Sequence, residues 1–364
     1  MGMRRTPPRR PTIKDIARRA GVSESAVSFA LNGRPGVSEA TRERVRRVAE
    51  QLGWQPSTAA RALSGEGAAT VGLVLARPAR TLGVESFFLQ LVSGVQEALA
   101  ARRFGLLFQV VEDLGAECAV YRRWWAERRV DGLLVVDPRA EDPRPGLLDE
   151  LGLPAVVVGA PDGPPGPPYA AISTLWADDT AAMTSIVDHL HTLGHRRITH
   201  IAGLPELAHT RRRMACLRAE AARRELPDVR SVTTDYSDAQ GAEATRRALS
   251  GPRPPTAIVY DNDVMAVAGL AVAAERGLSV PGDVSVVAWD DSALCRNTHP
   301  ALTSLTRDTP AFGRRAAEHL LSLLDGAPPH RIQDATPGLL PRASTAPPPH
   351  GEEPGGPGDP YGET

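Results

Sequence analysis

Short apolar runs alternate with helical stretches over most of this chain, and that alternation limits the fold more than any other feature. Seven such runs between residues 70 and 291 read TVGLVLA, GLLFQVV, DGLLVVD, PAVVVG, RRITHIAG, TAIVYDND and DVSVVAWDD. Continuous apolar strands separated by helices are typical of parallel sheets that helices cover on both faces. With roughly ten strands expected over about 275 residues, two doubly wound α/β lobes are favoured over one sheet.

The two ends of the chain differ in composition from the part between them. Residues 1–11 are rich in Arg and Pro, and residues 347–364 are rich in Pro, Gly and Glu. Both segments are expected to be disordered, because such compositions bury too little apolar surface to fold. No apolar run is long enough for a membrane span, and no secretory signal pattern is recognised. Three scattered cysteines argue against a disulfide framework and fit a reducing cytoplasm: Cys118, Cys216 and Cys295.

Residues 12–52 show the 3.6-residue periodicity of three short helices. Thr12, with Asp15 three residues later, predicts a capping box at the start of the first helix. Gly21 breaks that helix, Ser23 is a natural N-cap for a second, and Ser38 caps a third that ends near residue 53. Two helices joined by a tight turn form a helix-turn-helix, whose second helix enters the major groove of DNA.

The helix-turn-helix interpretation predicts which side chains contact DNA. Candidates to contact base edges lie at the start of the second helix and one turn later: Glu24, Ser25, Ala26 and Phe29. Candidates to hold phosphates through hydroxyl or amide groups are Thr12, Ser23, Ser28 and Asn32. The alternative is a small three-helix bundle that packs or binds protein.

Charge separates these alternatives. Residues 1–63 contain thirteen Arg or Lys against five Asp or Glu, a net charge of +8, which leaves −9 for the remaining residues of a chain whose net charge is −1. A basic head on an acidic body indicates a polyanionic partner at one end only.

Five segments resemble the LacI/GalR family of bacterial transcription regulators, in the family's order and over residues 12–345. They read TIKDIARRAGVSESAVSFALNG, VSEATRERVRRVAEQLGWQPSTAARALSG, HLHTLGHRRITHIAG, AIVYDNDVMAVAGLAVAAERGLSVPGDVSVVAWDD and PALTSLTRD. The resemblance implies that STAARALSG is a hinge that becomes helical on the operator and wedges a leucine into the minor groove. The matching hinge residues are Ser57, Ala60 and Leu63. Phe29 departs from the family, which commonly has an arginine there, so the operator cannot be copied from relatives.

The resemblance also implies a two-lobed periplasmic sugar-binding fold that closes around a ligand. Open α/β sheets bind ligands at the carboxyl ends of their strands, where this chain has YDND and AWDD. The positions that match the family's effector contacts, or lie beside them, are Phe87, Asp178, Arg211, Tyr236, Asn262, Trp289 and Asp290. Helix capping is an equal interpretation of Asp178, and core packing is an alternative for Phe87 and Trp289.

Other chemistry is less well supported. His189, His191, His195 and His200 suggest a metal site, but the surrounding sequence matches an ordinary helix-to-strand passage of the family. No Walker-type glycine loop and no GxSxG nucleophile elbow occurs, so we expect neither an enzyme nor a cofactor. The main rival is a cytoplasmic sugar-sensing protein whose head contacts protein.

Together these observations predict a cytoplasmic DNA-binding regulator, with repression favoured on family grounds. The expected partners are a palindromic operator, a sugar or sugar derivative, and a second copy of the chain, with a tetramer as an alternative to the dimer. The expected organisation is a DNA-binding domain at 12–56, a linker at 57–69 and a core at 70–346. Lobe 1 of that core is expected to comprise about 70–193 and 309–335, and lobe 2 about 194–308 and 336–346.

Overall fold

The computed structural model describes residues 11–54, 67–77, 86–160 and 172–349. By contacts between Cα atoms, the chain divides into two compact units, Met1–Ala68 and Ala69–Thr364. The first unit is called the head and the second the body, and each is described by itself.

Within residues 11–54 the head contains three helices, as the sequence predicted: α1 (Ile13–Ala20), α2 (Glu24–Leu31) and α3 (Glu39–Gln51). Asp15 accepts hydrogen bonds from the backbone N–H and hydroxyl of Thr12, at 2.9 and 2.7 Å, which forms the predicted capping box at α1. Ser23 and Ser38 cap α2 and α3 through their side-chain oxygens. The apolar faces of the three helices meet in one small core that includes Ile16, Val27, Ala30, Val45 and Ala49.

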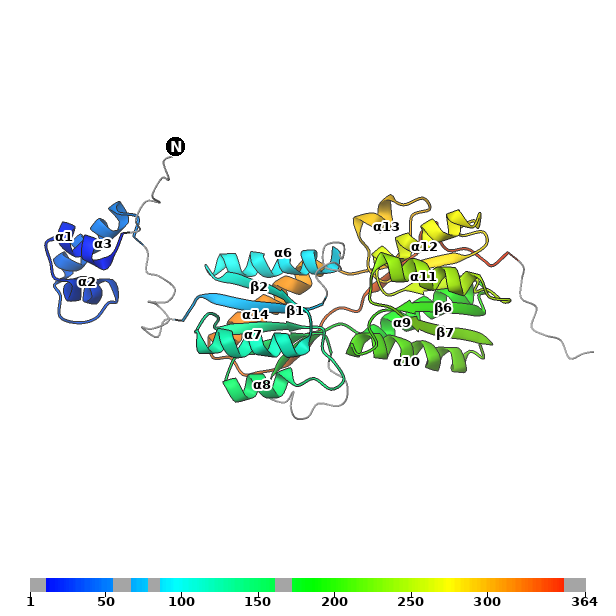
Figure 1. The fold of residues 1–364 in the computed structure, drawn as a ribbon, viewed down its shortest axis with the longest axis horizontal. Coiled ribbons are helices and arrows are strands. Elements are labelled where there is room, and N and C mark those ends of the chain that lie inside the picture. The colour runs from blue at the N-terminus through cyan, green and yellow to red at the C-terminus, as the bar shows by residue number, and fades with distance from the viewer. Residues whose placement is uncertain (1–10, 55–66, 78–85, 161–171, 350–364) are drawn as a thin grey trace, which may run out of the picture. The chain divides into compact units, whose positions relative to one another are not determined.

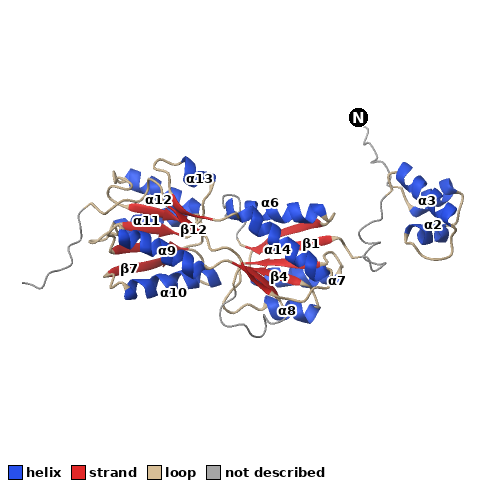
Figure 2. Cartoon of the chain, turned by 180° about the vertical axis from the view of Figure 1, so that it is seen from behind, coloured by secondary structure: helices blue, strands red, loops and turns tan. Residues whose placement is uncertain are grey.

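The described residues of the body form two six-stranded sheets, each lying between helices (Figures 1 and 2). The first sheet is parallel throughout and has the order β11-β5-β4-β3-β1-β2. Its strands are β1 (Thr70–Ala76), β2 (Gly105–Val111), β3 (Gly132–Val136), β4 (Ala155–Val158), β5 (Ser173–Trp176) and β11 (Arg331–Gln333). Helices α6 (Ser86–Ala101) and α14 (Thr309–Leu324) cover one face, while α7 (Leu114–Ala126) and α8 (Arg144–Leu151) cover the other. Helix α6 approaches α14 so closely at Gly94 that only glycine fits, since a Cβ there would lie 1.8 Å from the Pro310 carbonyl oxygen.

The second sheet has the order β12-β10-β9-β8-β6-β7, with only β12 antiparallel to its neighbour. Its strands are β6 (Arg197–Ala202), β7 (Asp228–Thr233), β8 (Ala257–Tyr260), β9 (Ser285–Ala288), β10 (Thr303–Thr306) and β12 (Gly338–Leu340). Helices α9 (Asp179–Thr192) and α10 (Ala208–Arg223) cover one face, and α11 (Asp238–Leu249) and α12 (Asp263–Glu275) cover the other. The short helix α13 (Ala293–Asn297) follows β9.

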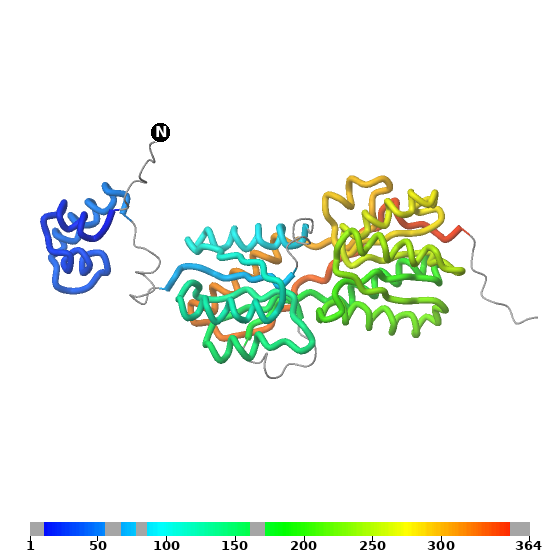
Figure 3. Tube along the Cα trace, in the orientation of Figure 1, coloured from blue at the N-terminus to red at the C-terminus, as the bar shows by residue number. Residues whose placement is uncertain are grey.

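The two lobes share one strand order, which confirms the predicted pair of doubly wound sheets. In each lobe the second strand along the chain lies at the edge beside the first, and the third lies on the first strand's other side. The chain crosses between lobes after β5, after β10 and between β11 and β12 (Figure 3). The predicted boundary near residue 193 is wrong. The first crossing precedes α9, since Met183, Ile186 and Val187 are buried against the second sheet.

Within the described ranges, none of the helices combines the length and the apolar character that a membrane crossing needs.

Candidate functional site

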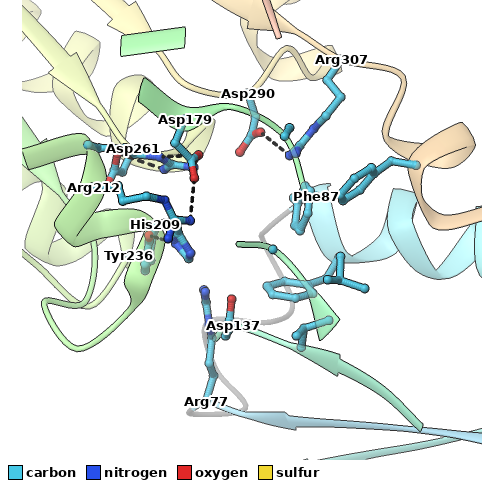
Figure 4. Close-up of a pocket in the computed structure, with 17 residues that line it drawn as sticks. Arg77, Phe87, Asp137, Asp179, His209, Arg212, Tyr236, Asp261, Asp290 and Arg307 are labelled. Atoms are coloured by element: carbon cyan, nitrogen blue, oxygen red, sulfur yellow. Dashed lines mark hydrogen bonds and ion pairs between the residues drawn. The ribbon is translucent and has the colours of Figure 1, made fainter. Parts of the chain in front are cut away.

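A pocket lies where the carboxyl ends of strands from both lobes meet (Figure 4). Its empty volume is about 720 Å³, a figure that includes open solvent at the mouth. Most of the polar lining residues come just after a strand. They are Arg77 after β1, Asp137 after β3, Asp179 after β5, Tyr236 after β7, Asp261 after β8, Asp290 after β9 and Arg307 after β10. The pocket therefore occupies the edge at which open α/β sheets bind ligands.

Lobe 1 contributes one close ion pair. The Arg77 Nε atom lies 2.7 Å from the Asp137 Oδ2 atom, and the Arg77 guanidinium holds the pKa of Asp137 below its ordinary value. Asp137 has a left-handed backbone with φ 54°. The buried Arg144 side chain donates to the Asp137 carbonyl oxygen at 2.8 Å and to that of Val136 at 2.8 Å. Arg144 thus positions the strained residue that presents the carboxylate to the pocket.

Lobe 2 contributes a carboxylate shared by two guanidiniums. Asp179, the first residue of α9, lies 2.9 Å from Arg212 Nη2 and 3.3 Å from Arg213 Nη2. These two arginines lower the pKa of Asp179. Arg212 also donates to the Ala160 carbonyl oxygen of lobe 1 at 2.8 Å, so the same side chain joins the two lobes.

Asp261 is a buried carboxylate at the end of β8 with three donors around it. It accepts from Arg213 Nη1 at 3.0 Å, from His200 Nε2 at 3.0 Å and from the Gly203 N–H at 2.8 Å. Arg213 and His200 hold the pKa of Asp261 far below its usual range. Arg213 in turn lies over the Trp289 ring, 3.6 Å from the centroid. The cation is therefore fixed by two carboxylates and an aromatic face.

Aromatic rings form the apolar part of the pocket. Arg307 lies over Phe87 and Phe312, 4.8 and 5.1 Å from their centroids, and 3.8 Å from Asp290. Burial lowers the pKa of Arg307. Arg77 lies 5.0 Å from the centroid of the Phe88 ring.

Tyr236 lies beside His209 and presents a hydroxyl to it. The distance from the Tyr236 hydroxyl to His209 Nε2 is 2.8 Å, and to the Thr210 hydroxyl 3.1 Å. Burial and the nearby Arg213 lower the pKa of His209 to about 4, so the imidazole is neutral at pH 7. The Tyr236 ring occupies the space that a side chain at residue 203 would take, since a Cβ on Gly203 would lie 1.8 Å from the ring.

The structure brings three of the seven predicted effector residues to the pocket: Phe87, Tyr236 and Asp290. The other four lie outside its lining. Asn262 caps α12 and donates to the Tyr236 carbonyl oxygen, and Trp289 is buried under Arg213. Asp178 caps α9 by accepting from the N–H groups of residues 180 and 181, at 3.0 Å each. Arg211 is exposed on α10.

Sequence reasoning missed several lining residues, among them Arg77, Asp137, Asp179, Arg212, Arg213, Asp261 and Arg307. A usable signal was present for three of these. Arg77, Asp137 and Asp261 directly follow apolar strands, as Asp290 nearly does. The same rule that selected AWDD therefore applied to the ends of β1, β3 and β8.

The candidate DNA-contacting residues of the head lie on and around α2. Exposed side chains are Thr12, Ser23, Glu24, Ser25, Phe29 and Asn32, while Ala26 and Ser28 are half-buried. Ser23 Oγ accepts from the Ala26 N–H at 3.1 Å, so its acceptor already caps the helix. Phe29 is 37% exposed, so its ring is accessible on the surface of the head. The predicted hinge residues Ser57, Ala60 and Leu63 lie outside the described residues.

Three of the four clustered histidines have structural partners. His195 bonds Thr256 and the carbonyl oxygen of Ala346, and His189 bonds Thr345. His200 bonds Asp261, as described above. In the described part of the chain, no group of three or more His, Cys, Asp or Glu side chains is arranged to hold a metal ion.

Comparison with known proteins identifies the family. A profile described as "Bacterial regulatory proteins, lacI family" matches residues 12–57, and one described as "Periplasmic binding protein-like domain" matches residues 187–345. The chain is 33% identical over 320 residues to the HTH-type transcriptional regulator CelR of Thermobifida fusca, which covers 87% of this chain and 93% of that protein. The chain belongs to the LacI family. It is therefore a DNA-binding transcriptional regulator and not an enzyme, as the sequence predicted.

Solved structures agree with this assignment. A complex described as transcriptional regulator CelR with cellobiose superposes with a TM-score of 0.69 at 31% identity, covering 92% of this chain and all of that one. A Lac repressor dimer bound to operator and the anti-inducer ONPF gives a TM-score of 0.79 at 25% identity, covering 93% of this chain and all of that one. The predicted head and two-lobed core are thus the LacI-family fold.

Proposed function

We propose that this LacI-family regulator represses transcription as a homodimer on a palindromic operator, and that a neutral sugar in the pocket between its lobes changes its operator affinity. The sugar would contact both lobes and so favour one lobe orientation over others. Linkage requires that sugar and operator change each other's affinity by the same factor, typically about 1–3 kcal/mol.

The pairing of charges in the pocket carries the proposal of an uncharged ligand. Among the described lining residues four are arginines, and each lies within 4 Å of a lining aspartate: Arg77–Asp137, Arg212–Asp179, Arg213–Asp261 and Arg307–Asp290. His209 adds no charge at pH 7. A phosphorylated ligand would have to compete with these carboxylates for the guanidiniums. Sugar hydroxyls donate to carboxylates and accept from guanidiniums without disrupting either.

The aromatic walls support the same ligand class. Phe87 and Tyr236 stand on different lobes, and sugar rings offer apolar C–H faces that pack on aromatic rings. We assign Phe87 and Tyr236 to such packing and Asp290 to hydrogen bonding with ligand hydroxyls. The CelR relative was solved with cellobiose, an uncharged disaccharide, which makes neutral disaccharides the first ligands to test.

Dimerisation and repression are supported by the family and by geometry. The Lac repressor neighbour is described as a dimer bound to operator, and the PurR relative of Escherichia coli, 30% identical, is named a repressor. One head binds one half-site. A palindrome has two half-sites whose centres lie about one helical turn apart, so its recognition needs a dimer with two-fold symmetry. A protein that binds chromosomal DNA in a bacterium works in the cytoplasm.

A thermal-shift screen of neutral sugars against sugar phosphates tests the ligand class. We expect at least one neutral mono- or disaccharide to raise the melting temperature, and Asp290→Ala to abolish the shift. Arg211→Ala is the matched control, because that side chain is exposed and does not line the pocket. Stabilisation by phosphorylated sugars alone would contradict the proposal.

A salt titration on an inverted-repeat duplex separates the regulator from a sugar-sensing protein whose head contacts protein. Operator binding should weaken steeply as salt rises, because bound phosphates release counterions. Absence of any preference for an inverted repeat over random duplex would reject the regulator.

A further inference from the structure

Two helices of lobe 1 end in arginines whose backbone is left-handed. Arg103 follows α6 with φ 57°, and Arg128 follows α7 with φ 51°. This conformation suits glycine, and four other helices of the body end beside glycines with positive φ: Gly152, Gly194, Gly277 and Gly326. A side chain with a Cβ is strained there, so arginine is not the residue that helix termination favours.

Both arginines lie beside the point where the chain enters the body. The N–H of Gly105 donates to the Ala69 carbonyl oxygen at 2.8 Å, and the N–H of Asp131 donates to the Thr70 carbonyl oxygen at 2.8 Å. Arg103 is two residues before Gly105, and Arg128 is three residues before Asp131. The ends of α6 and α7 therefore flank the start of β1, which follows directly from the linker that carries the head (Figure 1).

Arginines occur in adjacent pairs at both of these helix ends. Arg103 and Arg128 are exposed, and each has an arginine neighbour, Arg102 and Arg129. Arg102 pairs with Asp325 at 2.9 Å, and Arg129 with Glu127 at 3.7 Å. Four arginines, with the carboxylates of Asp325, Glu127 and Asp131, thus lie near the start of β1 on a body whose net charge is negative.

Lobe 2 provides an internal comparison. Helix α10 follows the first strand of its sheet, as α6 does in lobe 1, and it too ends at a left-handed residue that is not glycine. That residue is Glu225, with φ 51°, and it is exposed. The same strained position carries a cation in the lobe next to the linker and an anion in the lobe away from it.

We propose that Arg103 and Arg128 bind backbone phosphates of the DNA duplex that the head holds, and so form a second DNA-contacting surface on the body. Residues 55–68 join the head to this edge of the body, and a segment of that length spans at most roughly 50 Å when fully extended. Arginine is well suited to phosphate, since its guanidinium donates in a fixed fork. The surface adds affinity without base reading, because phosphate contacts carry no sequence information. The inference rests on the DNA binding of this regulator and extends it to the body.

The double variant Arg103→Gly/Arg128→Gly tests the surface. Glycine fits both backbone positions, so the variant removes two charges per chain without straining the backbone, and its melting temperature is measured alongside to show that it is folded. Operator affinity at low salt should fall tenfold or more, and affinity for a random duplex of equal length should fall by the same factor. The slope of log affinity against log salt should become shallower by about 1.8 per chain, or 0.9 for each lost phosphate contact.

Two controls make the result decisive. Glu225→Gly makes the same backbone change on lobe 2 and should leave the salt slope unchanged. Arg103→Lys/Arg128→Lys keeps the charges and should retain most of the slope. If the salt slope of the glycine double variant is unchanged while the wild-type protein binds the operator normally, the proposal of a second DNA-contacting surface is rejected and the role as a regulator is kept. Failure of the wild-type protein to bind any inverted repeat would instead reject its role as a regulator.

Discussion

Asp178 and Asp179 are adjacent carboxylates at the start of α9 with different partners, and replacing each one separately by asparagine tests the account of the pocket. Asp178 accepts two backbone N–H bonds as the N-cap of the helix. Asp179 accepts from Arg212 and Arg213 at 2.9 and 3.3 Å inside the pocket. Asparagine removes the charge in both variants while keeping the size of the side chain.

The expected losses of folding stability differ severalfold. Removing one partner of a buried ion pair typically costs about 3–5 kcal/mol, because a charge is left without compensation. Arg213 keeps Asp261 at 3.0 Å, and the Arg212 side chain is 22% exposed, so we place Asp179→Asn lower, at about 2–3 kcal/mol. Asparagine caps helices about as well as aspartate, so Asp178→Asn should cost less than about 0.5 kcal/mol.

Urea unfolding at pH 7 measures this difference as a shift of the midpoint at constant slope. The pKa of Asp179 lies below its ordinary 3.8, so its charge stabilises the fold above pH 3.8 and that contribution is lost as the pH falls through the lowered pKa. The gap between wild type and Asp179→Asn should therefore close in strong acid. The same variant should lose the sugar-induced thermal shift, whereas Asp178→Asn should keep it. Equal losses in the two variants, or a larger loss for Asp178→Asn, would refute the assignment of Asp179 to the pocket.

Three further predictions concern stability, the pocket and the head. Burial lowers the pKa of His195 to about 4, so the unfolded chain takes up a proton that the folded chain does not between pH 6.5 and 4. In that range His195 should lower the free energy of unfolding as the pH falls, by up to about 1.4 kcal/mol per pH unit. In the His195→Gln variant, denaturation should show a free energy of unfolding that depends less steeply on pH. Gly203→Ala should displace the Tyr236 ring and reduce the sugar-induced thermal shift. Gly251→Ala is the control and should leave the thermal shift unchanged, because a Cβ there would have no neighbouring atom closer than 3.9 Å. Identical thermal shifts in the two variants would contradict the close contact between Gly203 and Tyr236. Ser23→Ala should cost about 1 kcal/mol of head stability in thermal unfolding by loss of its cap, with recovery in Ser23→Asn; a neutral alanine variant would argue against the cap.

Much of the sheet architecture follows from local sequence. The runs at 70–76 and 105–111 coincide with β1 and β2, because continuous apolar residues bounded by polar ones favour the strands of a parallel sheet. β1 is buried inside its sheet, whereas β2 lies at the edge and is partly exposed. β7 escaped prediction since DVRSVT is a half-exposed edge strand that includes Asp and Arg. β11 and β12 are three residues long, and each lies at a sheet edge beside a strand distant in sequence, which no local pattern encodes.

The pocket was predictable in position but less so in residue identity. Tyr236 and Asp290 follow strand ends, which a parallel sheet brings to one edge. Consecutive residues on a helix point about 100° apart, so the choice among Arg211, Arg212 and Arg213 depends on how α10 is rotated against its sheet. The choice between Asp178 and Asp179 depends likewise on the residue at which α9 begins. Tertiary packing decides both, and it is encoded by residues far away in the chain.

The most direct test of the account measures operator affinity with and without a saturating sugar at one fixed salt concentration. The operator is an inverted repeat that the protein selects from a random pool, and the sugar is a neutral one that raises its melting temperature. The account predicts a change of operator affinity of roughly 5- to 150-fold, and an equal change of sugar affinity when operator is bound. Equal operator affinity with and without sugar would contradict the central claim that sugar binding in the pocket changes the affinity of the protein for its operator.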